Sequence, residues 1–415
     1  MEIEIPYGSV SQKISVKDEN ILKIVYPNSV RKRDENKILK EAFNNPVESP
    51  KLVEFLDNNK RFIIVVNDCQ RSTPTSKILN YLEPQLEGRD FIFLVATGDH
   101  RAPTLEEIKK ILGDKLYPKY HSKVTYHESK KSELHYFGQS KRGTEIYLNK
   151  LLFDYGAIIA INSLEPHYFA GYTGGRKSLV PGVAGYQTIT QNHSLSLYRE
   201  AQLTKLKGNP VHEDFEDIAR IVLEKIRIFA INVVIDGDGD IYACSTGHIL
   251  KSFYKLVEPA EEVYCAKIPS KADIVVTVAR PPLDINLYQA QKAIESAKIA
   301  VKDKGVIILV APCLEGIGPP DFYNLMKESN SPEEIFAKIK SNYKLGYHKT
   351  AKLIETAMFS NMFIVSQMNP DIFKGTFIKP FRTIGEALQE AFKITGPSAK
   401  ILFLMDGGTV APIIK

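Results

Sequence analysis

The fold of this chain is decided by Gly-Ala-Ile-Ile-Ala-Ile at residues 156–161 and by Pro-His-Tyr-Phe-Ala-Gly-Tyr-Thr-Gly-Gly-Arg-Lys-Ser at residues 166–178. The first stretch is typical of a buried strand, and the second is a glycine-rich segment that follows its carboxyl end. The segment partly resembles a phosphate-binding P-loop, but a P-loop requires glycine where this chain has Arg176. Glycines beside Lys177 still predict a backbone that approaches a ligand closely, with an amine held against it.

The same alternation continues on both sides of this stretch. Short apolar runs occupy residues 61–67, 90–97, 156–162, 229–236, 273–279, 305–312, 361–367 and 400–406. Segments with helical periodicity lie between them at residues 75–82, 104–112, 211–224, 285–301, 331–339 and 384–392. Continuous apolar strands alternating with amphipathic helices indicate mainly parallel sheets covered on both faces. We therefore predict an α/β fold with two doubly wound, Rossmann-like domains and an interdomain cleft.

The polar segment at residues 254–271 is the best candidate for a domain boundary. It predicts an N-terminal α/β domain over residues 1–265 and a C-terminal α/β domain over residues 270–402, both of ordinary size. We expect the tail, residues 403–415, to return to the N-terminal domain.

The composition is that of an ordinary globular protein. Of 415 residues, 44% are hydrophobic and 25% are charged, and the net charge is +5, so we expect no nucleic-acid partner. The four cysteines form no C-x-x-C pair, which is typical of free thiols in a reducing compartment. Because the first residues lack the features of a signal peptide and no apolar run approaches about 18 residues, we expect a cytoplasmic protein without a membrane partner. The sequence specifies no oligomeric state.

Each polar cluster follows the carboxyl end of a predicted strand. These clusters are Asn-Asp-Cys-Gln-Arg-Ser-Thr-Pro at 67–74, Thr-Gly-Asp-His-Arg at 97–101, the segment at 162–178, and Ala-Arg-Pro-Pro-Leu-Asp at 279–284 with the helix that follows it. Ligands of open α/β sheets bind outside the carboxyl ends of the strands. The clusters therefore predict one shared site, three parts of it from the first domain and one from the second.

Each cluster also has a purely structural interpretation. Asp68 and Arg71 could form a local ion pair, residues 98–101 could form a turn, and Asp284 could cap a helix. His193 could be an isolated core histidine. The remaining histidines show no partner pattern, and we expect them to be solvated: His121, His127, His135, His212, His248 and His348. The Asp-Gly-Asp-Gly-Asp at 236–240 lacks the distal glutamate of a calcium loop and predicts a turn.

Taken together, these segments resemble the lactate racemase family of nickel-dependent 2-hydroxyacid racemases and epimerases. The resemblance runs essentially end to end. Its most specific parts are residues 166–177 and Asp-Ile-Asn-Leu-Tyr-Gln-Ala-Gln-Lys at 284–292, and the other matches are residues 68–74, residues 98–101 and Asn192-His193. It implies an isomerase that inverts Cα of lactate or of a longer or different 2-hydroxy acid.

The resemblance also implies a cofactor, a nickel pincer nucleotide (Ni(II) pyridinium-3,5-bisthiocarboxylic acid mononucleotide), together with partner enzymes that synthesise it. By similarity, Lys177 carries this group covalently and His193 supplies the remaining nickel ligand, which suits a square-planar Ni(II). The residues that match the family's contact with the nucleotide are Asp68, Cys69, Gln70 and Arg71.

In this family a hydride leaves Cα for the cofactor while a base removes the hydroxyl proton. His100 and His167 match the family's two acid/bases, one for each enantiomer, and imidazole suits this role because its ordinary pKa is about 6.5. The residues that match substrate-binding groups are Arg71, Tyr288, Gln289 and Lys292.

One position departs from the family pattern. Where relatives often carry two glycines and an aromatic residue, this chain has Ala-Arg-Pro-Pro at 279–282. Arg280 could bind a second carboxylate or a longer polar chain, which weakens the expectation that lactate is the substrate.

Two alternatives belong to other classes. The chain could be a non-catalytic cofactor carrier or a sugar-acid binding module on the same scaffold, although simple binding requires neither His100 nor His167. A nicotinamide dehydrogenase would need a G-x-G-x-x-G turn after a strand, and the chain has none.

Overall fold

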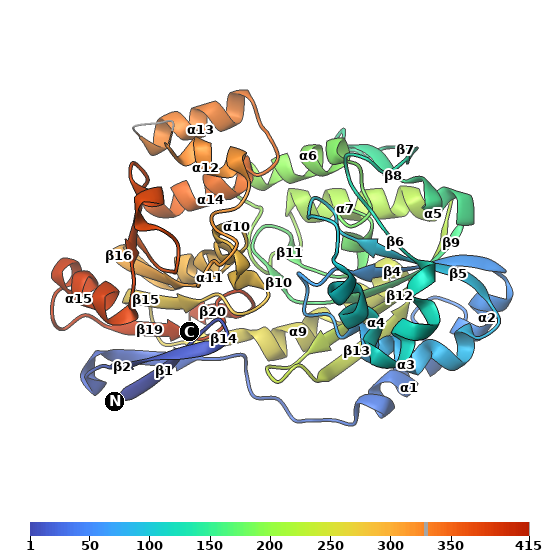
Figure 1. The fold of residues 1–415 in the computed structure, drawn as a ribbon, viewed down its shortest axis with the longest axis horizontal. Helices are drawn as coiled ribbons and strands as arrows, with labels where there is room; N and C mark the ends of the chain where they lie inside the picture. The colour runs from blue at the N-terminus through green and yellow to red at the C-terminus, as the bar shows by residue number, and fades with distance from the viewer. Residues whose placement is uncertain (328–330, 415) are drawn as a thin grey trace. The chain divides into compact units, whose positions relative to one another are not determined.

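The computed structural model describes residues 1–327 and 331–414. The chain divides into two compact units. The central unit is Ser29–Val263, and the terminal unit combines Met1–Asn28 with the chain from Tyr264 onward. Each unit is built on a six-stranded sheet, and the α/β class with mainly parallel sheets is confirmed (Figure 1).

The sheet of the central unit has the strand order β13-β12-β9-β4-β5-β6 and is parallel except between β12 and β13. Its strands are β4 (Arg61–Asn67), β5 (Asp90–Ala96), β6 (Val124–Tyr126), β9 (Ala157–Ser163), β12 (Arg227–Ile235) and β13 (Ile241–Gly247). Smaller antiparallel pairs join β7 (Leu134–Gln139) to β8 (Glu145–Asn149) and β10 (Pro166–His167) to β11 (Gly171–Tyr172). The helices are α1 (Glu35–Asn44), α2 (Leu52–Asp57), α3 (Thr75–Leu86), α4 (Leu105–Tyr120), α5 (Lys150–Tyr155), α6 (Tyr186–Ser194), α7 (Pro210–Leu223), α8 (Ile249–Tyr254) and α9 (Val257–Tyr264).

Burial on both faces explains why the strands of this sheet read as continuous apolar runs. In β4, the side chains of Phe62, Ile64 and Val66 belong to a core that includes apolar residues of α1 to α4. Ile63 and Val65 are equally buried and point to the opposite face, because side chains alternate along a strand. On that face α5 contacts β4 and α8 contacts β12.

The sheet of the terminal unit is wholly parallel, with the order β18-β17-β16-β15-β19-β3. Its strands are β3 (Ile21–Val25), β15 (Ala272–Val278), β16 (Val301–Val310), β17 (Asn361–Val365), β18 (Ile378–Phe381) and β19 (Ile401–Leu404). Beside it lie the antiparallel hairpin of β1 (Glu2–Tyr7) and β2 (Val10–Ser15) and the parallel pair of β14 (Cys265–Ile268) and β20 (Ala411–Ile414). The helices are α10 (Leu287–Ala290), α11 (Lys292–Ala300), α12 (Pro320–Lys327), α13 (Pro332–Ser341), α14 (Tyr347–Ala357) and α15 (Ile384–Thr395).

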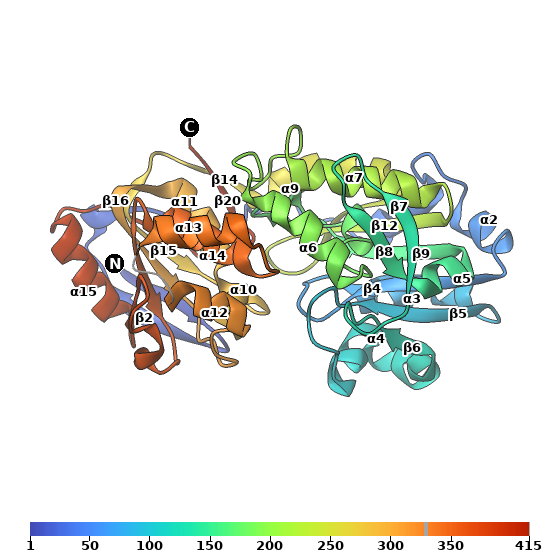
Figure 2. The same cartoon turned by 90° about the horizontal axis from the view of Figure 1, so that it is seen from above.

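The two faces of this sheet are covered differently. Val275 of β15 belongs to a core with residues of α11, α12 and α14. Its neighbours Ile274 and Val276 belong to a second core, formed with the β1–β2 hairpin and α15. Figure 2 shows the blue hairpin beside the red α15, so the two ends of the chain together cover one face. Among the described residues, no helix is both long and apolar enough to cross a membrane.

The domain boundaries differ from the prediction at both ends of the chain. The observed division between Val263 and Tyr264 lies inside the predicted boundary segment. However, Met1–Asn28 was predicted to lie in the N-terminal domain and instead joins the terminal unit, because β3 pairs with β19. The tail was expected to return to the N-terminal domain, but β20 pairs with β14 inside the terminal unit. Pairings across most of the chain length leave no local signal in the sequence.

Candidate active site

Three of the predicted polar clusters lie in the central unit, after the neighbouring strands β9, β4 and β5. Hydrogen bonds link their loops. Thr73, after β4, bonds through Oγ1 to the Ser163 Oγ at the end of β9 (2.8 Å). Gly98, after β5, donates its backbone N–H to the carbonyl oxygen of Gly182 (3.0 Å), and the N–H of Gly182 bonds to the carbonyl oxygen of Lys177 (3.1 Å). The three loops therefore form one connected layer at the carboxyl edge of the sheet.

His100 is oriented by a carboxylate from the neighbouring loop. Its Nδ1 lies 2.7 Å from Asp68 Oδ2, and the side chains of His100 and Asp68 are 17% and 8% exposed. The other Asp68 oxygen accepts the backbone N–H of Gln70 (3.2 Å), which fixes the carboxylate. A carboxylate can only accept, so the His100 Nδ1 carries a proton and, in a neutral ring, Nε2 carries the lone pair.

The other residues of the β4 loop are placed as follows. The Cys69 Sγ donates to the carbonyl oxygen of Glu107 (3.4 Å), and burial raises the pKa of its thiol to about 11, so Cys69 is a neutral thiol and not a thiolate ligand. Gln70 and Arg71 are half-buried. Within residues 1–327 and 331–414, the Arg71 guanidinium makes no hydrogen bond or ion pair, so the alternative interpretation as a local ion pair with Asp68 does not hold.

The glycine loop, residues 166–178, is buried along its whole length. Its glycines are required by packing within the protein. A Cβ on Gly171 (φ +74°) would lie 2.5 Å from the carbonyl oxygen of Lys205, and one on Gly174 (φ +82°) would lie 2.5 Å from a methyl group of Leu164. These contacts are sufficient to require glycine at both positions, and the close approach to a ligand stays a prediction.

Arg176 explains why this segment is not a P-loop. Its side chain is fully buried and donates at 3.0–3.2 Å to four carbonyl oxygens of the loop, those of Ala170, Tyr172, Thr173 and Gly174. It also bonds to the His212 Nδ1 (3.0 Å) and lies over the Phe253 ring at 3.9 Å. Burial lowers the pKa of Arg176 to about 9. Burial, followed by the Arg176 charge, lowers the pKa of His212 to about 2, so His212 is a neutral acceptor that helps hold the loop.

Lys177 and two predicted histidines meet around two aromatic rings. The Lys177 Nζ lies 3.5 Å from the His167 Nε2, 5.5 Å from the centre of the Phe169 ring and 5.2 Å from that of Phe215. The His193 ring lies edge-on to the same two rings, with centroids 5.1 and 6.4 Å away. An amine and two imidazoles therefore lie beside the same aromatic side chains in the central unit.

His167 has a different environment from His100. Its Nδ1 accepts the backbone N–H of Ala170 (3.3 Å). A backbone N–H can only donate, so Nδ1 carries the lone pair and, in a neutral ring, Nε2 carries the proton.

His193 is oriented by a chain of buried polar groups. Asp214 is fully buried and accepts from the Asn192 Nδ2 (2.8 Å), which leaves the Asn192 Oδ1 as the acceptor for the His193 Nδ1 (3.2 Å). Asp214 also accepts from Ser140 and Thr144. The His193 Nε2 therefore carries a lone pair, as a metal-ligating imidazole requires. Asp214 could not be singled out from the sequence, because its partners lie far away in the chain.

The implied nickel cofactor can be compared with these groups. Among the described residues, no three side chains of histidine, cysteine, aspartate or glutamate gather as metal ligands. A metal beside His193 would take its other ligands from a bound group, as a pincer nucleotide provides. The buried Asn162 Nδ2 at the end of β9 has no hydrogen-bond partner, so it is available as a donor to such a group. The residues present fit the cofactor.

The remaining predicted residues lie in the terminal unit. The Lys292 Nζ donates to the Gln289 Oε1 (2.6 Å). Lys349 donates to the carbonyl oxygen of Tyr288 (2.6 Å) and lies 3.4 Å from the centre of its ring, so it fixes the start of α10. The expected cap Asp284 lies instead in a short 3-10 helix, and Asn286 caps α10 through the backbone N–H of Gln289 (2.9 Å).

Three histidines that were expected to be solvated are buried. His127 is fully buried between the carbonyl oxygen of Ala184 (2.8 Å) and the Asn149 side chain (3.1 Å), and burial lowers its pKa. His212 and His348 are each 2% exposed. The turn at 236–240 forms as expected and joins β12 to β13.

Known proteins resemble the chain along nearly its whole length. A model of the lactate racemase N-terminal domain matches residues 7–204, and a model of the lactate racemase C-terminal domain matches residues 267–412. A protein named lactate racemase from Thermoanaerobacterium thermosaccharolyticum is 32% identical over 425 residues, and one from Lactiplantibacillus plantarum is 29% identical over 428 residues. Both alignments cover 98% of this chain and 98% of the relative.

Solved structures agree with these matches. The lactate racemase apoprotein from Thermoanaerobacterium thermosaccharolyticum superposes with a TM-score of 0.90 at 32% identity, covering 100% of both chains. A Thermotoga maritima protein matches with a TM-score of 0.73 at 20% identity, over 92% of this chain and 98% of that one. At that identity the second match concerns the fold alone.

Proposed function

The chain belongs to the lactate racemase family, and on that premise we propose that it is an isomerase that interconverts the two enantiomers of a 2-hydroxy acid. Lactate is the first substrate to test, because relatives at about one-third identity are named for it. The observation that carries the proposal is that the Nδ1 of His100 donates a hydrogen bond, whereas the Nδ1 of His167 accepts one. This difference matters because inversion requires one group that takes a proton and another that gives one.

The proposed cofactor is the nickel pincer nucleotide, attached to Lys177, with the His193 Nε2 as a nickel ligand. When bound, this group supplies a hydride acceptor. The support is that Lys177 and His193 lie against the same two aromatic rings. The His167 Nε2–H can donate to the Lys177 Nζ, 3.5 Å away, only if the amine is neutral, and a neutral amine is the nucleophilic form. Asp68, Cys69, Gln70 and Arg71 are proposed to contact the nucleotide.

The proposed proton transfers use the ring nitrogens that face away from the orienting groups. The His100 Nε2 takes the hydroxyl proton of one enantiomer. The His167 Nε2–H gives a proton to the substrate oxygen as the opposite enantiomer forms, and the proton that His100 has taken returns to His167 through solvent before the next turnover. The reverse reaction begins with that proton on His100 and runs the same transfers backwards. Asp68 balances the charge on His100 when that ring becomes an imidazolium.

Substrate recognition is proposed to use Arg71, Tyr288, Gln289 and Lys292. The Arg71 guanidinium has no partner in the described part of the chain and suits a carboxylate, which it can bind through two hydrogen bonds. The Arg280 guanidinium likewise makes no hydrogen bond or ion pair among the described residues. We propose that it extends the substrate range to 2-hydroxy acids with a second carboxylate or a longer polar chain.

The cellular setting follows from the same proposal. The cofactor would come from biosynthetic partner enzymes, and the four free cysteines suit the reducing cytoplasm.

The experiment is to produce the chain together with cofactor-synthesising enzymes and to measure intact mass and racemisation on one sample. The expected result is a mass adduct that Lys177→Met abolishes, together with conversion of either lactate enantiomer to a racemic mixture. An adduct without interconversion of any 2-hydroxy acid would instead identify a cofactor carrier. Comparing lactate with malate in the wild type and in Arg280→Ala tests the substrate range. A preference for lactate that Arg280→Ala leaves unchanged would remove the role of Arg280.

A further inference from the structure

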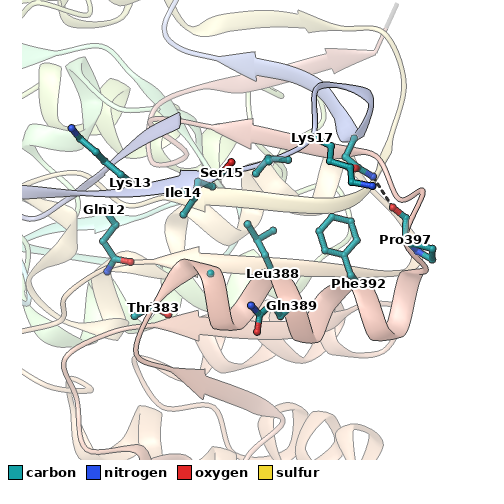
Figure 3. Close-up of a pocket in the computed structure, with 13 residues that line it drawn as sticks. Gln12, Lys13, Ile14, Ser15, Lys17, Thr383, Leu388, Gln389, Phe392 and Pro397 are labelled. Carbon is teal, nitrogen blue, oxygen red and sulfur yellow. Dashed lines mark hydrogen bonds between the residues drawn. The ribbon is translucent and has the colours of Figure 1, made fainter. Parts of the chain in front are cut away.

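The terminal unit has a groove whose lining contains none of the candidate site residues. It lies between β2 and α15 and has a volume of about 780 Å³. In Figure 3, Leu388 and Phe392 project from α15 toward β2. Ile14 and Val16 also line the groove, so it has an apolar floor between a strand and a helix.

The backbone of β2 is unpaired along this groove. Among the described residues, β2 pairs only with β1. Met1 and Val16 exchange both of their backbone hydrogen bonds, at 2.8 and 3.0 Å. Hydrogen-bonded and non-hydrogen-bonded pairs alternate in an antiparallel ladder, so this pair fixes the phase of the hairpin. Pro6, which has no N–H, lies opposite Ser11 in a non-hydrogen-bonded pair, as this phase requires. The residues whose N–H and C=O groups point away from β1 are therefore Ser11, Lys13 and Ser15.

The charge of the groove has one sign. Among the described residues that line it, Lys13 and Lys17 are charged and none is a carboxylate. Both side chains are exposed, and Lys17 has a single carboxylate neighbour, Glu19 at 3.7 Å. The groove therefore suits a ligand with negative charge.

The same charge argues against a second copy of this chain as the occupant. Two β2 strands paired antiparallel about Lys13 would place the lysines opposite each other, and like charges directly opposite destabilise a sheet. A lysine in an edge strand commonly prevents such self-pairing. An acidic strand would meet complementary charge at the same position.

We propose that β2 and α15 form a docking groove for an acidic segment of a partner protein, which binds in extended conformation as an added strand on β2. Its backbone would pair with Ser11, Lys13 and Ser15, and its apolar side chains would alternate into the space above Leu388 and Phe392. β2 has six residues, so it can pair with about 20 Å of extended chain.

The test uses the full chain and a short fluorescent peptide that alternates glutamate with valine. We expect saturable binding by fluorescence anisotropy, and slower amide hydrogen exchange at Ser11, Lys13 and Ser15 when the peptide is bound. Lys13→Gln should weaken binding by about threefold to fivefold, because it removes the charge opposite the peptide glutamate without placing a second carboxylate opposite Glu4 of β1. The control Lys271→Gln makes the same charge change at an exposed residue outside the groove and should alter affinity by less than about twofold.

Three results would overturn the proposal. One is equal binding of a peptide that alternates lysine with valine. A second is equal binding of the glutamate peptide after its backbone nitrogens are methylated, because an added strand needs those N–H groups. The third is protection of the β2 amides that rises with protein concentration in the absence of peptide, which would identify a second copy as the occupant.

Discussion

His100 and His167 have the same side chain, lie in the same unit and are held in opposite ways. The His100 side chain is 17% exposed, and its Nδ1–H donates a hydrogen bond to the Asp68 carboxylate. His167 is 6% exposed and receives the backbone N–H of Ala170 on Nδ1. The first partner is an anion from another loop, whereas the second is a main-chain group three residues away.

This difference assigns opposite roles before any substrate binds. A carboxylate on Nδ1 makes Nε2 a base, and a backbone donor on Nδ1 makes Nε2 an acid. A racemase needs both at once, on opposite faces of the substrate. Two identical side chains can therefore perform different halves of one reaction because of what their second nitrogen contacts.

The largest effect is expected from removing either histidine. His100→Asn and His167→Asn should each lower interconversion of enantiomers by about 10³-fold, the scale of a lost acid/base group. Each variant should still form a trace of 2-keto acid from one enantiomer only, and the two variants should differ in which one. Acid-quenched reactions started from each pure enantiomer measure this, with His121→Asn at an exposed histidine as the control. Loss of keto acid from both enantiomers in both variants would remove the division of roles.

The second effect concerns Arg176, whose buried guanidinium holds the glycine loop that carries His167. Arg176→Met should lower the free energy of unfolding by about 3–5 kcal/mol, because it removes the side-chain donor of four buried carbonyl oxygens. Those of Ala170 and Gly174 keep a backbone N–H donor. Denaturant unfolding measures this. The control Arg142→Met removes an exposed ion pair with Glu213 and should cost less than about 1 kcal/mol. Equal values for the two variants would show that the buried guanidinium does not hold the loop.

The bounds of the strands could be predicted better than the residues that cap the helices. β4 was predicted with both of its bounds, because five buried apolar residues lie between polar Arg61 and Asn67. The helix predicted at 285–301 is divided into α10 and α11 at Gln291. Asp284 and Asn286 are both good cap residues, and long-range contacts such as Leu287 N–H to the carbonyl oxygen of Gly316 (3.1 Å) decide between them.

The candidate site shows the same limit. The types and order of Lys177, His167 and His193 can be read from the sequence, and the structure brings these three together. The buried polar residues that hold these three side chains in place could not be predicted, because burial of a polar residue depends on partners that are distant in the chain. His212 was expected to be solvated, yet it contacts Arg176, which lies 36 positions away.

A smaller effect is expected from the group that orients His100. Asp68→Leu should lower kcat by about tenfold to a hundredfold, because the ring loses the partner that fixes its tautomer and orientation. The substrate KM should change much less. Steady-state kinetics on the cofactor-loaded enzyme measure both values, and Asp114→Leu, at a highly exposed carboxylate, is the control. A change in KM with kcat unchanged would assign Asp68 to binding only.

The smallest effect is a dependence of stability on pH. The pKa of His212 is lowered from 6.5 to about 2 in the folded chain, so the unfolded chain takes up a proton first. Its contribution is fully present above pH 6.5 and is lost as pH falls toward 2, by up to about 1.4 kcal/mol per pH unit. His212→Asn keeps an acceptor for Arg176 without titrating. The variant should therefore lose less stability than the wild type between pH 6.5 and 5, and parallel curves would contradict this assignment.

The most direct test of how the two rings are held is nitrogen-15 NMR of the histidine rings in alkaline solution, which reports the nitrogen that carries the proton. The predicted spectra place the proton of His100 on Nδ1 and that of His167 on Nε2, with the resonances assigned by the two asparagine variants. If both rings carry the proton on the same nitrogen, the chain does not preset a base and an acid, and the proposed division of the reaction fails.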